Sequence, residues 1–194
     1  MKIFSNVKRL LINVDMVNGF VNEGPMHDSY INHIVPMQIR LMEAYESDEE
    51  GVIAIVKDTH REGCREFNRY PVHCLENTYE SELIDDLKRF ETMDACIFRK
   101  NSTSTIYAKG FLEMIENLPS LEEVVIVGCC TDICILNLAI PLQNYFDEMN
   151  RNVTITIPKN GVETYDSPTH KRYEYNDMAF KMLSQAGINI VEVM

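Results

Sequence analysis

The chain has 194 residues, of which 45% are hydrophobic and 25% are charged. That composition is ordinary for a globular protein, and the length suits one domain over residues 1–194. The net charge of −12 argues against a nucleic-acid or anionic-membrane partner, because both need a basic face. No apolar run approaches the roughly 20 residues that span a bilayer, and the N-terminal run 10–14 is broken by Asn13. We therefore expect a cytoplasmic protein.

Short apolar runs rich in β-branched residues alternate with segments of helical period. The predicted strands are 9–14, 52–56, 96–99, 123–127, 153–157 and 188–193, and the predicted helices are 32–45, 106–115, 132–146 and 175–185. Pro141 lies inside the third helix and should kink or break it. Such alternation predicts an α/β fold, a single three-layer α/β/α domain with a mostly parallel sheet of about six strands.

Titratable side chains end four of these strands, where ligands bind in parallel α/β sheets. The polar strand ends are Asp15, 57–60, Arg99-Lys100 and 128–134. Cys134 lies where a strand runs into a helix, so that unpaired N–H groups and the helix dipole should favour its thiolate.

A nucleophilic cysteine needs a base to carry its proton and a cation to hold its charge. Asp15 and Lys100 supply these groups from neighbouring strand ends. Taken singly, each residue also fits a structural role: Cys134 as a buried helix cysteine, Asp15 as a strand-end cap and Lys100 as a surface lysine. Their convergence at one sheet edge favours catalysis.

A second cluster contains Asp58, His60, Glu66 and His73. Mixed carboxylate and imidazole ligands suit Zn²⁺ first, and Mn²⁺ or Fe²⁺ next. Spacing alone does not distinguish such a metal site from histidines that are hydrogen-bonded or solvated in a polar loop.

Three motifs resemble those of the isochorismatase-like cysteine hydrolases. Residues 127–135, Val-Gly-Cys-Cys-Thr-Asp-Ile-Cys-Ile, are similar to the family's nucleophile motif, in which the last cysteine attacks. Residues 11–20 resemble the segment that ends in Asp-Met-Gln-Asn-Asp-Phe, and 98–100 followed by Tyr107 resemble the lysine segment. Gly19 departs from the family pattern, because aspartate often stands there.

This resemblance implies the chemistry of the site. It makes Cys134, Asp15 and Lys100 a catalytic triad. It also implies a cis peptide bond between Cys129 and Cys130, with the backbone N–H groups of Cys130 and Cys134 forming an oxyanion hole.

Within this superfamily the loop 71–74, Pro-Val-His-Cys, resembles the Pro-Pro-His-Cys of nicotinamidases. The resemblance implies that Asp58, His60 and His73 bind a metal ion that holds the pyridine nitrogen, with Glu66 as the candidate fourth ligand. Most other branches of the superfamily lack this loop signature. Nicotinamide is therefore the expected substrate.

The aromatic residues Phe20, Tyr70 and Tyr107 match positions that wall the ring pocket in nicotinamidases, although ordinary packing would also explain them. We expect an enzyme that hydrolyses a small-molecule amide and forms a homo-oligomer. Two rival readings remain: another isochorismatase-type amidase on the same triad, and a non-catalytic metal- or ligand-binding relative.

Overall fold

A parallel sheet forms the centre of the computed structural model, which describes residues 4–92 and 94–194. The seven strands are β1 (Arg9–Val14), β2 (Gly51–Asp58), β3 (Cys96–Lys100), β4 (Glu123–Cys129), β5 (Thr154–Pro158), β6 (Val162–Glu163) and β7 (Asn189–Val191). Their order is β3-β2-β1-β4-β5-β7, and β6 pairs with β4 off this path. The predicted α/β class is confirmed, with one more strand than the patterns indicated.

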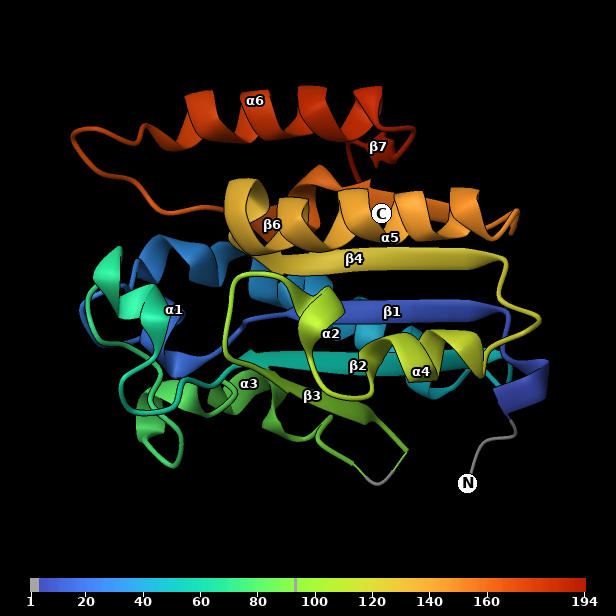
Figure 1. The fold of residues 1–194 in the computed structure, drawn as a ribbon, viewed down its shortest axis with the longest axis horizontal. Helices are drawn as coiled ribbons and strands as arrows, with labels where there is room; N and C mark the ends of the chain where they lie inside the picture. The colour runs from blue at the N-terminus through green and yellow to red at the C-terminus, as the bar shows by residue number, and fades with distance from the viewer. Residues whose placement is uncertain (1–3, 93) are drawn as a thin grey trace.

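Helices cover both faces of this sheet (Figure 1). They are α1 (Asn18–Val21), α2 (Val35–Glu46), α3 (Asp85–Lys88), α4 (Phe111–Glu116), α5 (Leu136–Glu148) and α6 (Arg172–Gln185). Successive side chains of a strand point to opposite faces, so β1 contributes to two cores. Leu10 and Ile12 pack in the core that includes α4 and α5, whereas Leu11 packs in the one that includes α2. No helix within the described residues is long and apolar enough to cross a membrane.

The helix α5 continues through Pro141, so of the kink or break expected at this position the break does not occur. A proline has no N–H to donate to the carbonyl four residues earlier, which here belongs to Asn137. The hydroxyl of Ser104 donates to that carbonyl instead, at 2.8 Å. A side chain from another element therefore satisfies the acceptor that the proline leaves free.

Two backbone features bring β1 and β4 close together at the carboxyl edge of the sheet. Gly128 has a φ of 123°, and a Cβ placed there would lie 2.0 Å from the carbonyl oxygen of Val14, so only glycine fits. Asp15 has a φ of 56°, in the left-handed region that non-glycine residues adopt mainly where the surrounding structure enforces it. This geometry places Asp15 beside the turn that follows β4.

Candidate active site

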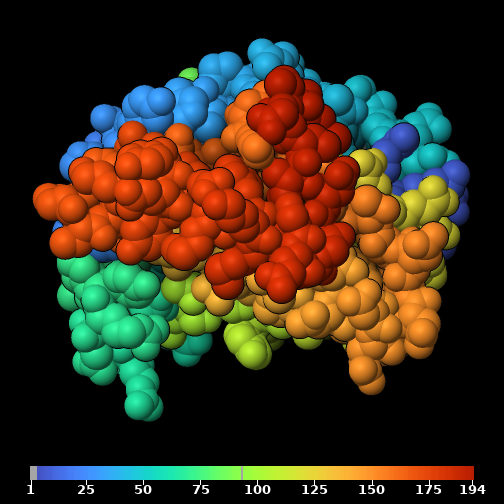
Figure 2. All heavy atoms as spheres, turned by 90° about the horizontal axis from the view of Figure 1, so that it is seen from above, coloured from blue at the N-terminus to red at the C-terminus, as the bar shows by residue number. Residues whose placement is uncertain are grey.

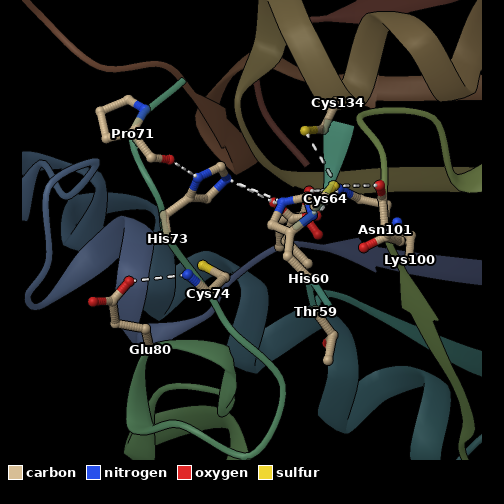
Figure 3. A network of polar contacts seen from close by, with 12 residues as sticks. Thr59, His60, Cys64, Pro71, His73, Cys74, Glu80, Lys100, Asn101 and Cys134 are labelled. Carbon is tan, nitrogen blue, oxygen red and sulfur yellow. Dashed lines mark hydrogen bonds and ion pairs between the residues drawn. The ribbon is translucent and has the colours of Figure 1, made fainter. Parts of the chain in front are cut away.

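Lys100, at the end of β3, is the centre of the site. The residue is buried, with 2% of its surface exposed. Its Nζ lies 2.8 Å from Oδ2 of Asp15 and 2.9 Å from Oδ1 of Asp58. The same nitrogen lies 3.7 Å from Sγ of Cys134 (Figure 3). The structure thus brings the three predicted triad residues together, and it adds Asp58 as a second carboxylate on the lysine.

Burial dominates the electrostatics of Asp15 and Cys134. It raises the pKa of Asp15 to about 6, and Lys100 opposes this rise without cancelling it. Burial also raises the pKa of the Cys134 thiol well above its ordinary value, with Lys100 lowering it only in part. Burial therefore opposes the thiolate that the helix N-terminus should favour, and the Cys134 thiol lies next to a carboxylate that can accept its proton.

The turn after β4 presents Cys134 to this lysine. The peptide bond between Cys129 and Cys130 is cis, as the family resemblance implied, and Thr131–Ile135 form a π-helical turn that leads into α5. Cys129 is buried, and its thiol donates to the backbone oxygen of Asp15 at 3.2 Å. Cys129 thus joins β1 to β4, whereas Cys130 and Cys134 line the cavity described below.

The predicted metal ligands form a buried cluster directly beside the triad. Oδ2 of Asp58 lies 3.0 Å from Nε2 of His60 and 3.3 Å from Nε2 of His73, and the two imidazole nitrogens are 3.2 Å apart. Burial raises the pKa of Asp58, but the neighbouring charge of Lys100 is the largest of the effects that bring the pKa below its ordinary value, so the carboxylate is ionised. One aspartate therefore links the lysine to both histidines.

Neighbouring groups orient both imidazoles toward this point. Nδ1 of His73 lies 2.7 Å from the carbonyl of Pro71, to which it donates, leaving Nε2 to face the cluster. The thiol of Cys64 donates to the carbonyl of Asn101, and its sulfur lies 3.4 Å from Nδ1 of His60. With the thiol proton engaged in this way, the Nδ1–H of His60 donates to the sulfur and its Nε2 carries a lone pair (Figure 3).

Glu66 lies next to this donor set, in a second group with His60 and Cys64. It is 5% exposed, and its Oε2 is buried without a hydrogen-bond partner among the described residues. Potential ligand atoms of His60, Cys64 and Glu66 lie within 4.8 Å of one another, as do those of Asp58, His60 and His73. Buried acceptor atoms that converge without donors between them fit a divalent cation, and the N/O chemistry fits Zn²⁺.

A cavity of about 410 Å³, including its open mouth, joins the thiol to this cluster. It is lined by Phe20, Met26, Asp58, Glu66, Tyr70, His73, Thr103, Cys130, Ile133, Cys134 and Tyr165. Phe20 and Tyr70 therefore line the cavity, as the family resemblance implied. Tyr107 is not: its side chain is 82% exposed, and it borders a separate groove with Arg99 and Lys109.

Gly19, the departure from the family pattern, has a packing explanation. A Cβ at this position would lie 2.5 Å from Sγ of Cys74, which is fully buried. The backbone N–H of Cys74 donates to Glu80, which also contacts the Gly19 position (Figure 3). The cysteine after His73 thus fills the space that a larger side chain would need.

Comparisons with known proteins show the family and the fold of the chain. The isochorismatase domain model matches residues 9–193. Nicotinamidase 1 of Arabidopsis thaliana is 28% identical over 180 residues, which cover 82% of this chain and 71% of that protein. The nicotinamidase of Bacillus subtilis is 22% identical, with a TM-score of 0.77 and coverage of 96% of this chain and 100% of that one. The pyrazinamidase of Pyrococcus horikoshii, solved in complex with zinc, is also 22% identical, with a TM-score of 0.75 and coverage of 95% and 98%.

The family model covers the sheet, the helices and all the residues of the candidate site. We conclude that the chain belongs to the isochorismatase family of hydrolases.

Proposed function

We propose that this enzyme hydrolyses nicotinamide to nicotinate and ammonia. The observation that carries this proposal is a single cavity that contains the Cys134 thiol, aromatic walls and the carboxylate and imidazole donors of a metal site. The likeness to the Arabidopsis nicotinamidase supports the same substrate. The neighbour that was solved with zinc supports the same metal.

The reaction proceeds in two covalent steps. Sγ of Cys134 attacks the carboxamide carbon while its proton passes to Asp15, and the N–H groups of Cys130 and Cys134 stabilise the oxyanion. The C–N bond then breaks, Asp15 returns the proton to the leaving ammonia, and a thioester remains. Water attacks this thioester after losing a proton to Asp15, the C–S bond breaks, and the thiol regains that proton. Lys100 balances the charge of the carboxylate and of the sulfur throughout.

The cavity lining favours a neutral aromatic amide over an anionic substrate. No lysine or arginine lines the cavity among the described residues, and Lys100 is already shared between two carboxylates. A dicarboxylate such as isochorismate would need a basic side chain there in addition to a metal ion. Asp58, His60 and His73 would hold a Zn²⁺ ion, with Glu66 as the candidate fourth ligand, and the ion would supply a Lewis-acidic partner for a pyridine nitrogen.

Benzamide tests this assignment, since it has the same carboxamide and no ring nitrogen. The enzyme as purified should contain stoichiometric metal. It should release ammonia from nicotinamide at least about 100-fold more efficiently than from benzamide, because benzamide has no nitrogen to bind the buried metal ion. Chelation should lower nicotinamide turnover toward the benzamide level, while circular dichroism and labelling of Cys134 by iodoacetamide stay largely unchanged.

His73→Ala should reduce both the metal content and the preference for nicotinamide. Val72→Ala is the matched control, because Val72 is exposed and adjacent to His73. Equal hydrolysis of the two amides, or purified protein without metal, would remove the substrate assignment and leave an amidase of other specificity.

The activity should depend on pH through Asp15. Its pKa of about 6 means that the carboxylate is protonated below this pH and cannot accept the thiol proton. We expect kcat/KM to fall about tenfold per pH unit below pH 6 and to level off above it. A profile that stays level down to pH 4.5, in protein shown by circular dichroism to remain folded, would mean that no essential carboxylate has a pKa raised to about 6 and would contradict the raised pKa of Asp15.

A further inference from the structure

Residues 164–171 join β6 to α6 and have no role in the mechanism above, yet they contribute to the catalytic cavity. Tyr165 lines that cavity together with Cys130 and Cys134. Figure 2 shows this C-terminal part of the chain, coloured orange to red, lying across one face between the blue N-terminal region and the green loop. Contacts that hold this segment therefore also hold one wall of the cavity.

Asp132 links the segment between β6 and α6 to the turn that contains Cys134. It lies in the same turn as Cys134, Thr131–Ile135. One of its carboxylate oxygens accepts a hydrogen bond from Oγ1 of Thr164, and the other lies 2.8 Å from Nε2 of His170. The side chains of Asp132 and His170 are each 8% exposed, so this pair is poorly screened by solvent.

His170 is held between two tyrosine rings. The ring of Tyr165 stacks on it at a centroid distance of 3.9 Å and an interplanar angle of 8°. Tyr175, from α6, stacks on it at 3.6 Å and 25°, which requires the opposite face of the imidazole. Nδ1 of His170 also lies 3.0 Å from the backbone oxygen of Tyr165. Both nitrogens of the His170 ring thus face acceptor oxygens. His170 contacts the backbone oxygen of Tyr165 through Nδ1 and the ring of Tyr165 by stacking, so it holds both parts of that residue.

The outer side of the segment is tied to another wall of the cavity. Arg172 forms an ion pair with Asp28, and the backbone N–H of Asp166 donates to the same carboxylate at 3.0 Å. Met26 lies in the loop before Asp28 and lines the cavity. Tyr165 is therefore held from the nucleophile turn on one side and from this loop on the other.

We propose that Asp132 and His170 are positioning residues that hold Tyr165 as the wall against which a flat substrate ring packs, and that this wall selects aromatic over aliphatic amides. This inference rests on the proposed function, which identifies the amide bond as the bond that is cleaved. It adds the residues that make the enzyme prefer a substrate with an aromatic ring. Neither residue touches the substrate, so both act through Tyr165.

Kinetics of single and double variants test this coupling. Tyr165→Leu and His170→Phe should each raise the KM for nicotinamide by about tenfold, the order of one aromatic contact, with kcat within about threefold of wild type. His170→Phe keeps a ring between the tyrosines and loses both hydrogen bonds. Because His170 acts through Tyr165, the double variant should be no worse than Tyr165→Leu alone. Tyr173→Leu, on α6 and exposed, is the matched control and should change nothing.

Alkylation of Cys134 gives a readout that does not depend on the natural substrate. The wild-type ratio of labelling rates for N-phenyl iodoacetamide over iodoacetamide should fall in His170→Phe and in Tyr165→Leu. Tyr175→Leu, which removes one stacking partner, replaces His170→Phe if that variant does not fold. Additive effects on KM, or an unchanged labelling ratio in the folded variants, would overturn the proposal. If wild type does not hydrolyse nicotinamide, the proposed function fails, and the labelling ratio still decides the role of Tyr165.

Discussion

Cys134→Ala should leave a folded protein whose amide hydrolysis falls by at least about 10⁴-fold, because no other group can take over the covalent step. The Cys134 side chain is small and buried, and alanine fits in the same space. The thermal midpoint should therefore change by only a few degrees. Ammonia release and a melting curve on the same preparation check both parts of this expectation.

Cys130 is the natural control, because it lies in the same turn and lines the same cavity. Cys130→Ala keeps the backbone N–H that the oxyanion hole needs, so its activity should stay within about tenfold of wild type. With a slow substrate, mass spectrometry should find an acyl adduct on Cys134 in the wild-type enzyme. An adduct on Cys130, or full activity in Cys134→Ala, would mean that the other sulfur attacks.

The central strands β1, β2, β4 and β5 could be predicted because they are almost entirely buried and therefore consist of continuous apolar runs. The predicted 9–14 strand coincides with β1, Arg9–Val14. The strand β6, Val162–Glu163, could not be predicted, since two residues carry no periodicity. The predicted 106–115 helix was also too long, because Gly110 has a φ of 82° and α4 begins only after it.

The triad could be predicted because each member follows a recognisable strand. The double role of Asp58 could not, since spacing says nothing about whether its two oxygens face Lys100 or the histidines. Tyr107 was misplaced because its motif position says nothing about the direction of the 3-10 turn that carries it. The contact of Asp132 with His170 joins positions 38 residues apart, and no local pattern encodes it.

Lys100→Met should both destabilise the protein and abolish its activity. The ammonium lies between the carboxylates of Asp15 and Asp58 in a buried site, so its removal leaves two uncompensated acids. Breaking a buried charge pair in this way costs about 3–5 kcal/mol. For a chain of this size, that corresponds to a thermal midpoint lower by roughly 6–20 °C. Lys57→Met is the matched control, because Lys57 forms an ion pair with the partly exposed Glu91 away from the triad, and its loss should cost about 1–2 kcal/mol and keep activity.

The loss of activity in Lys100→Met follows from the changed pKa values of Asp15 and Cys134. A second substitution, at Asp15, distinguishes this loss from the loss of stability. Lys100 lowers the pKa values of Asp15 and Cys134, so without it both groups hold their protons more tightly. Labelling of Cys134 by iodoacetamide at neutral pH should then slow. The double variant Asp15→Asn with Lys100→Met removes one of the two uncompensated charges, and it should melt at a higher temperature than Lys100→Met while remaining inactive. If Lys100→Met is labelled at the wild-type rate across pH 6 to 9, the lysine does not act on the thiol, and its ion pairs with Asp15 and Asp58 serve only the stability of the sheet edge.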